Sequence, residues 1–283
     1  MTKKKLLLCT DMDRTVIPNG RQPEEPTARQ RFSAFCHNDA VTLVYVTGRH
    51  QSLVQKAIKS YNLPAPDYVI ADVGTKIYHV DASQWHTMSS WEQEIAKDWQ
   101  HKTHQQIKDI IGQVPNLSLQ ERSKQNTHKL SYYLPLYIDK DAVINQMHTN
   151  LEQHNIAASL VWSIDEPQGI GLLDVLPKHA TKLHAILFLQ QYLGFAENDI
   201  VFAGDSGNDL PVLESSIQSV LVANASQEVR QTAQQLATKA GHSHSLYLAN
   251  GGDSGLNGNY SAGVLEGVSY FMPELRSLIQ QET

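Results

Sequence analysis

Short apolar segments separated by amphipathic ones recur along the chain and predict alternating strands and helices. Buried strands are expected at residues 6–10, 41–47, 68–71, 171–176, 200–203 and 220–223. Helical patterns are expected at residues 26–37, 52–61, 181–193, 228–240 and 261–271. Because strands that alternate with helices form parallel sheets covered by helices, the pattern predicts an α/β fold with a Rossmann-like parallel sheet.

The pattern changes after Gly74. Shorter strands are expected at residues 76–80, 85–86, 129–134 and 159–164, and helices at residues 91–111 and 142–154. This mixture predicts an α+β domain inserted into the α/β core. The core is expected at residues 1–80 and 171–283 and the inserted domain at residues 81–170, while the glycine-rich stretch 250–258 is expected to be a mobile surface loop.

Composition narrows the class of protein. The chain has 283 residues, of which 41% are hydrophobic and 18% charged, as is ordinary for a globular protein with room for two domains. The net charge of −6 comes with no basic cluster, which argues against a nucleic-acid partner. Two cysteines, Cys9 and Cys36, form neither a disulfide framework nor a zinc site and fit a reducing compartment.

The N-terminal segment has only part of the pattern of a signal peptide. Lys3, Lys4 and Lys5 precede a short apolar run, but this run is too short for a signal peptide and Asp11 interrupts it. No stretch approaches the roughly 18 apolar residues of a membrane span. We therefore expect a cytoplasmic protein without a membrane partner.

Four polar clusters follow predicted strands or begin a predicted helix. They are Asp11 with Asp13, the run 47–49 that begins with Thr47, Lys182 at a helix start, and the run 204–209 with sequence GDSGND. Ligands of open α/β sheets bind outside the carboxyl ends of the strands. We therefore expect the four clusters to converge at that edge.

The residue types suit the cleavage of a phosphate monoester. A carboxylate can serve as nucleophile and form an aspartyl-phosphate. Several carboxylates without His or Cys favour a hard ion such as Mg²⁺. Lys182 and Thr47 can bind phosphoryl oxygens, the lysine as a point charge and the threonine as a neutral donor.

This combination resembles the haloacid dehalogenase (HAD) superfamily of phosphatases. The matching motifs are D-x-D-x-T at residues 11–15, Thr47, Lys182 and G-D-x-x-x-D at residues 204–209. The resemblance implies that Asp11 is the nucleophile, and that Asp13 protonates the leaving alcohol and then activates water. It also implies that Asp11, Asp13 through its carbonyl, Asp205 and Asp209 form the Mg²⁺ site, and that Lys182 pairs with Asp11 and the phosphate.

The inserted domain resembles the α+β (type IIB) cap of HAD enzymes that act on sugar phosphates. Within them the chain is most similar to the sucrose-phosphate phosphatases and related glycosyl-phosphate phosphatases, through the runs 46–49, 73–78, 129–132, 204–209 and 261–265. The candidate substrate contacts are Arg49, Gly74, Thr75, Lys129, Lys178, Ser206 and Asn208. Arg49 could also simply cap the sheet. The chain departs from the family pattern at Arg14, where Asn or Gly is common, and at Lys76, where an acidic residue is expected.

We therefore expect a phosphoric monoester hydrolase that is Mg²⁺-dependent and acts on a small-molecule sugar phosphate. Sucrose 6-phosphate is the first candidate substrate, and mannosyl- or glucosyl-3-phosphoglycerate and mannosylfructose phosphate are the alternatives. Two further hypotheses are that the protein is a phosphomutase or a non-catalytic sugar-phosphate sensor. The expected assembly is a monomer or weak homodimer that works beside a glycosyltransferase.

Overall fold

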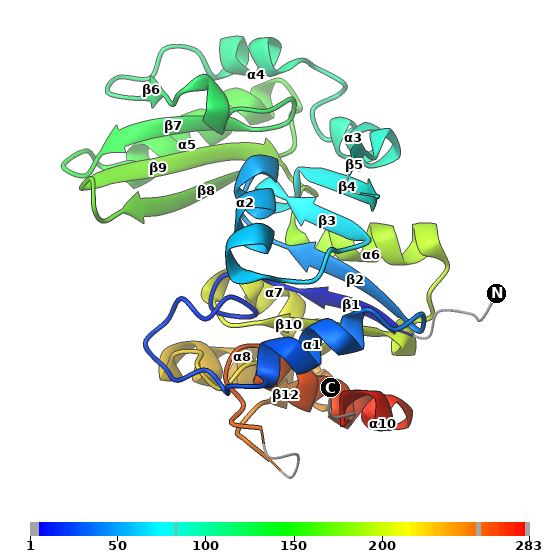
Figure 1. The fold of residues 1–283 in the computed structure, drawn as a ribbon. Helices are drawn as coiled ribbons and strands as arrows, with labels where there is room; N and C mark the ends of the chain where they lie inside the picture. The colour runs from blue at the N-terminus through cyan, green and yellow to red at the C-terminus, as the bar shows by residue number, and fades with distance from the viewer. Residues whose placement is uncertain (1–5, 83, 253–255, 281–283) are drawn as a thin grey trace. The chain divides into compact units, whose positions relative to one another are not determined.

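The computed structural model describes residues 6–82, 84–252 and 256–280. The chain divides into two compact units, each described by itself. The core domain comprises the described residues up to Thr87 and from Lys182 onward, and the inserted domain comprises Met88–Thr181. The α/β core with an inserted α+β domain, predicted from the alternating pattern, is confirmed (Figure 1).

The core domain is built on one eight-stranded sheet in the order β12-β11-β10-β1-β2-β3-β4-β5. Its strands are β1 (Leu6–Thr10), β2 (Val41–Val46), β3 (Tyr68–Ala71), β4 (Lys76–Asp81), β5 (Gln84–Thr87), β10 (Ile200–Gly204), β11 (Gln218–Leu221) and β12 (Leu246–Leu248). The six strands from β12 to β3 pair in parallel, and β4 and β5 are added antiparallel. Strand β12 was missed by the sequence pattern because its three residues are all only partly buried.

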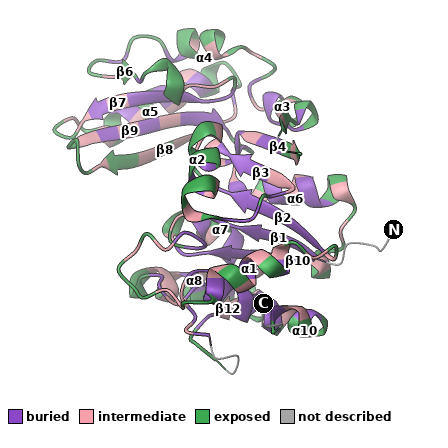
Figure 2. Ribbon diagram, viewed as in Figure 1, coloured by how far each residue is buried: buried purple, intermediate pink, exposed green. Residues whose placement is uncertain are grey.

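Helices cover both faces of this sheet. One face packs against α1 (Ala28–Cys36), α2 (Gln51–Tyr61), α9 (Ser261–Phe271) and α10 (Arg276–Ile279). The other carries α6 (Lys182–Leu193), α7 (Leu210–Leu213) and α8 (Gln227–Ala240). The central strands β1, β2 and β10 are buried along their whole length (Figure 2), which explains their unbroken apolar sequence.

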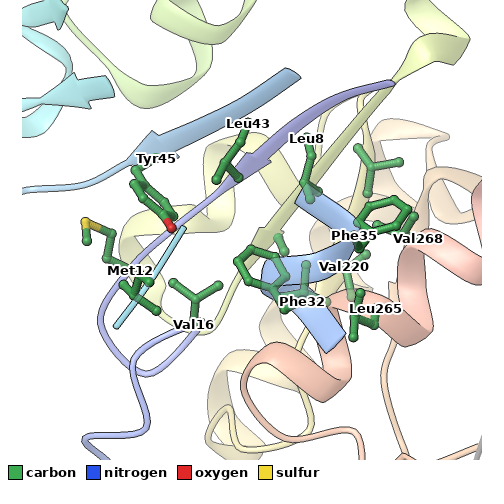
Figure 3. Close-up of a cluster of buried hydrophobic side chains, with 14 of the residues drawn as sticks. Leu8, Met12, Val16, Phe32, Phe35, Leu43, Tyr45, Val220, Leu265 and Val268 are labelled. Atoms are coloured by element: carbon green, nitrogen blue, oxygen red, sulfur yellow. The ribbon is translucent and has the colours of Figure 1, made fainter. Parts of the chain in front are cut away.

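The first face holds the larger hydrophobic core. Leu8 of β1 and Leu43 of β2 point toward Phe32 and Phe35 of α1, and Leu265 of α9 completes the cluster (Figure 3). These side chains have at most 1% of their surface exposed. Apolar burial of this extent fixes the strands and therefore the positions of the residues at their carboxyl ends.

The inserted domain contains a separate four-stranded antiparallel sheet in the order β6-β7-β9-β8. Its elements are α3 (Ser89–Ala96), α4 (His104–Ile111), β6 (Ser118–Leu119), β7 (Leu130–Pro135), α5 (Lys140–Gln153), β8 (Ala158–Asp165) and β9 (Ile170–Pro177). Helices α4 and α5 pack on the sheet through Ile107, Met147 and Leu173. This domain thus has its own core.

The single helix expected at residues 91–111 is wrong. The segment forms α3 and α4, separated by a turn in which Gln100 and His101 have φ values of 50° and 56°. Helices do not contain such left-handed residues. Thr103 is the N-cap of α4 and forms a capping box with Gln106. The prediction of one helix rested on apolar spacing and did not use this N-cap signal.

The domain limits also differ from the expected residues 81–170. Strand β5 pairs with β4 and so extends the core sheet to Thr87. Strand β9, expected in the core, pairs with β7 and β8 of the inserted sheet and carries that domain to Thr181. An apolar run identifies a buried strand but does not say which sheet it joins.

Two further expectations concern the glycine-rich stretch 250–258 and membrane-spanning helices. Residues 253–255 of the glycine-rich stretch lie outside the described residues, while the backbone N–H groups of Asn250 and Gly251 donate to the buried carboxylate of Glu266 at 3.0 Å each. Within the described ranges, no helix combines the length and apolar character required to cross a bilayer.

Candidate active site

The carboxyl ends of the parallel strands gather the polar clusters of the core domain. Asp11 follows β1, and its N–H donates to the Ala203 carbonyl of β10 at 2.8 Å. Asp205 follows β10 directly, and Thr47 follows β2. The parallel pairing of these three strands therefore brings residues that are far apart in sequence to one edge of the sheet.

Lys182 links two carboxylates at this edge. It is the first residue of α6, and its Nζ lies 3.0 Å from Asp11 Oδ2 and 2.7 Å from Asp209 Oδ1. All three side chains are buried. Burial disfavours the ammonium ion, but the two carboxylates outweigh this effect and raise the pKa of Lys182. Lys182 is thus a permanent cation against Asp11.

Burial acts in the opposite direction on the carboxylates. It raises the pKa of Asp11 to about 7; the charge of Asp209 adds to this shift, and Lys182 opposes it. The Met12 N–H donates to Asp11 Oδ1 at 2.7 Å and fixes the orientation of the carboxylate. Asp11 is therefore positioned by one donor on each oxygen.

Asp209 is fully engaged by protein donors. Its Oδ1 accepts from Lys182, and its Oδ2 accepts from the Asp205 N–H, the Ser206 N–H and the Ser206 Oγ at 3.0–3.1 Å. A Cβ on Gly204 would lie 2.5 Å from Asp209 Cγ, so only glycine leaves room for this carboxylate. Asp209 organises the turn after β10.

The Asp205 carboxylate lies between a hydroxyl group and a guanidinium group. Its Oδ1 accepts from Thr15 Oγ1 at 3.4 Å, and its Oδ2 lies 3.4 Å from Arg14 Nε. Burial, with the charge of Asp209, raises the pKa of Asp205 to about 6, against the opposing effects of Arg14 and Lys182.

Arg14 adopts a left-handed conformation with φ of 56°. Asn and Gly adopt this conformation at the lowest energy, which explains why those residues are common at this place in the motif. The strained turn is held by Asn224, whose Nδ2 donates to the Arg14 carbonyl at 2.6 Å. Asn224 was not predicted, because only the three-dimensional fold brings it to residue 14.

Asp13 faces a different set of partners. Arg49 Nε donates to its Oδ2 at 2.7 Å, and Arg49 Nη2 donates to its Oδ1 at 2.6 Å. Asn19 Nδ2 donates to Oδ1 at 2.8 Å. Burial raises the pKa of Asp13, but hydrogen bonds and charge from Arg49, with Asn19, outweigh burial and lower it. Arg49 thus contacts the second aspartate of the motif in this conformation.

A strained loop lies beside Thr47. Asp72, Val73 and Gly74 have φ values of 50°, 61° and 96°, and the first two N–H groups donate to the carbonyls of Arg49 and Thr47. A β-branched residue such as Val73 rarely adopts this conformation, and such strain concentrates at functional sites. The neighbouring Thr75 is fully buried, and its Oγ1 donates to the Asp72 carbonyl at 2.9 Å.

The carboxylates fit a hard divalent cation. One oxygen each from Asp11, Asp205 and Asp209 lies within 4.8 Å of the others, and all three residues are buried. Burial, with the charge of Asp209, raises the pKa values of Asp11 and Asp205, and a bound cation such as Mg²⁺ would favour their ionised forms. Because Asp209 already accepts four hydrogen bonds, three of them on Oδ2, Asp11 and Asp205 are the side chains best placed as direct ligands.

The remaining predicted substrate contacts are distributed over both domains. Ser206 belongs to the Asp209 turn, and Asn208 is exposed two residues further on. Lys129 and Lys178 lie in the inserted domain; Lys178 is exposed, whereas Lys129 is buried with its Nζ 3.7 Å from Asp174 Oδ2. Asp174 was missed because it lies inside an apolar strand pattern.

Comparisons with known proteins cover nearly the whole chain. The family model for sucrose-6F-phosphate phosphohydrolase matches residues 4–272. A HAD-like hydrolase of Nitrosococcus oceani is 49% identical over 278 residues, which are 98% of this chain and 75% of the relative. The mannosylfructose-phosphate phosphatase of Agrobacterium fabrum is 30% identical over 235 residues, which are 81% of this chain and 87% of the relative.

A solved structure extends the likeness to the fold. The sucrose-phosphatase of Synechocystis sp. PCC6803, determined in complex with sucrose and phosphate, is 25% identical with a TM-score of 0.70, over 95% of this chain and 98% of that one. The chain spans only about half, 52%, of the length of a sucrose-phosphatase of Nicotiana tabacum that it also matches. The similarity thus includes both the core and the inserted domain.

Proposed function

Because the chain belongs to the sucrose-6F-phosphate phosphohydrolase family, we propose that it is a Mg²⁺-dependent phosphatase that hydrolyses a disaccharide phosphate, with sucrose 6-phosphate as the first candidate. The observation that best supports this proposal is the pairing of Lys182 with Asp11 and Asp209 at the carboxyl edge of the sheet. Mannosylfructose phosphate is the second candidate, since the phosphatase named for it is 30% identical to this chain.

In the first step, a carboxylate oxygen of Asp11 attacks the phosphorus atom and the bond from phosphorus to the sugar oxygen breaks. Asp13 gives a proton to that oxygen, so the sugar leaves as a neutral alcohol and the phosphoryl group remains on Asp11. The Lys182 ammonium neutralises charge on the phosphoryl oxygens. Met12 N–H keeps Asp11 in the orientation for attack.

In the second step, Asp13 takes a proton from water and the resulting oxygen attacks the phosphorus atom of the aspartyl-phosphate. The bond from phosphorus to Asp11 breaks, which releases inorganic phosphate, restores the Asp11 carboxylate and leaves Asp13 protonated for the next cycle. Arg49 and Asn19 bind the Asp13 carboxylate and thus favour its ionised form, the form that accepts the proton.

Asp11 and Asp205 would hold the Mg²⁺ ion. Asp209 would position them indirectly, because it accepts hydrogen bonds from Lys182, which pairs with Asp11, and from the Asp205 N–H. When bound, the ion supplies charge neutralisation for the phosphate and for the carboxylates around it. Thr47 and the strained loop 72–75 are proposed to contact the substrate beside them.

A phosphate-release screen tests the function. The purified chain with Mg²⁺ would be assayed on sucrose 6-phosphate, mannosylfructose phosphate, mannosyl- and glucosyl-3-phosphoglycerate, and trehalose 6-phosphate. We expect the highest kcat/KM for one of the first two. Conversion of a sugar phosphate into an isomer without phosphate release would instead indicate a mutase, and binding without turnover on all five would indicate a sensor.

Mg²⁺ is expected to stabilise the protein more at pH 8 than at pH 5. The pKa values of Asp11 and Asp205 are raised from 3.8 to about 7 and about 6, so between pH 4 and pH 7 the folded state binds more protons than the unfolded state. Without metal, stability therefore falls as the pH rises through this window. A divalent cation bound to the ionised carboxylates would offset the burial cost and the repulsion that cause this fall.

Thermal unfolding with EDTA or with Mg²⁺ measures the effect. One kcal/mol corresponds to roughly 2–4 °C in a protein of this size, so we expect the Mg²⁺-induced rise in Tm to be at least about 3 °C larger at pH 8. Asp205→Asn is expected to remove most of the rise at pH 8. Equal rises at both pH values would contradict metal binding at this cluster.

The inserted domain is proposed to recognise the sugar through the polar face of its sheet. Leu130 and Tyr132 of β7 pack toward the helices, so the alternate residue Ser131 lies on the opposite face, where its Oγ donates to Asp174 and Lys129 lies near the same carboxylate. Such a cluster of donors and acceptors suits sugar hydroxyl groups.

Lys129→Gln is expected to raise KM for the sugar phosphate about tenfold with little change in kcat, because the contact is made equally in the ground state and the transition state. Lys140→Gln, at a partly exposed lysine of the same domain that pairs with Asp141, is the matched control and should change neither constant. A loss confined to kcat would place Lys129 in the chemical step and contradict this role.

A further inference from the structure

A second polar hollow lies in the core domain, away from the carboxyl edge that holds the active site. It has a volume of about 350 Å³ and is lined by Thr42 of β2, Asp67 and Tyr68 at the start of β3, His79 of β4, and residues 193–195 at the end of α6. Ligand pockets of proteins begin at roughly 300 Å³. The hollow therefore has the size of a small-molecule site.

The sheet itself builds one wall. Tyr68 pairs with His79 and His79 with His86 across three neighbouring strands, so the three rings point to the same face of the sheet. Their centroids are 5.0 and 6.5 Å apart. Because Val69 and Ala71 pack into the core on the opposite face, this aromatic row faces the side of α6.

Polar atoms complete the lining. Thr42 is only 2% exposed, and its Oγ1 has no hydrogen-bond partner among the described residues. A buried hydroxyl left without a partner costs about 1–3 kcal/mol, so a ligand group that reached Thr42 Oγ1 would be favoured there. Asp67 supplies a carboxylate, of which Oδ2 accepts from the Leu43 N–H at 2.9 Å.

The charge of the hollow excludes an anionic ligand. Among the described residues that line it there is no Lys or Arg, and Asp67 is acidic. A phosphate ester would therefore meet repulsion and no permanent cation. An aromatic wall beside a carboxylate and a hydroxyl suits the apolar face and the hydroxyl groups of a neutral sugar.

We propose that this hollow is a binding site for a neutral saccharide, separate from the active site. Thr42 and Thr47 lie near opposite ends of β2, five residues apart, so the two sites are separated by roughly 16 Å. Helix α6 spans the same interval, since it begins with Lys182 at the active site and ends with Leu193 at the hollow.

Sucrose binding to the full chain tests this proposal by NMR of the backbone amides. We expect added sucrose to shift resonances of Thr42, Tyr68 and Phe195 as one group, with an affinity independent of inorganic phosphate. His79→Ala, at an exposed side chain, should weaken binding at this group about fivefold and leave phosphate release unchanged, because one stacked ring is lost. Thr42→Val should also weaken it.

Several outcomes would overturn the proposal. They are the absence of shifts in this group, an unchanged affinity in His79→Ala and Thr42→Val, or equal shifts with sucrose 6-phosphate in EDTA, where it is not hydrolysed to sucrose. Shifts that depend on protein concentration without sugar would identify the hollow as a contact between copies of the chain. Phosphate release is measured separately, so failure of this proposal and failure of the phosphatase proposal are distinguishable.

Discussion

Asp11→Asn is expected to lower kcat for phosphate release by at least about 10³-fold, because the amide oxygen cannot form the aspartyl-phosphate. The fold should persist. Asp11 already has a pKa raised to about 7 by burial, so a neutral side chain of the same shape suits this environment. We expect Tm in EDTA at pH 8 to be equal to or higher than that of the unmodified chain.

The measurement pairs steady-state phosphate release with circular dichroism and thermal unfolding. Asp13→Asn serves as a comparison, since it should lower turnover while leaving Asp11 able to accept the phosphoryl group. Trapping of labelled phosphate on the protein is then expected only where Asp11 is present. Hydrolysis by Asp11→Asn above about one tenth of the normal rate would exclude Asp11 as the nucleophile.

Lys182→Met is expected to impair both activity and stability. Removal of one partner from a buried ion pair costs about 3–5 kcal/mol, because the remaining charges are left without compensation. Here two buried carboxylates, Asp11 and Asp209, would lose their shared cation. The kcat should fall by about 10²-fold or more, since the charge on the phosphoryl oxygens would lose its ammonium partner.

Denaturant unfolding with matched variants separates the two effects. Lys239→Met, at an exposed lysine of α8, should change the free energy of unfolding by less than about 0.5 kcal/mol. The double variant Lys182→Met with Asp209→Asn should recover part of the stability but none of the activity. Recovery of activity in the double variant would contradict a direct role for Lys182.

The sequence predicted the fold class and the residues at the strand ends for one physical reason. Buried strands are short and apolar, and polar residues directly after them must lie at the sheet edge. Asp11 and Asp205 lie together at this edge, and Lys182 joins them from the start of α6.

Other features depend on tertiary structure and left no local signal. Arg49 reaches Asp13 through a long side chain whose direction no spacing defines. Asn19 and Asn224 act through loops that the fold brings back to residues 13 and 14. The assignment of β9 to the inserted sheet follows from its pairing partners, because its apolar pattern suits either sheet.

The pairing of β1 with β10 has a consequence for folding kinetics. Leu7 is in register with Ile200, so these neighbours at the centre of the core sheet are separated by most of the chain. Pairing over such sequence distances is slow, whereas the internal contacts of the inserted domain join residues within Met88–Thr181. During synthesis, the inserted domain is therefore expected to fold first, and the catalytic charges assemble only when β10 emerges.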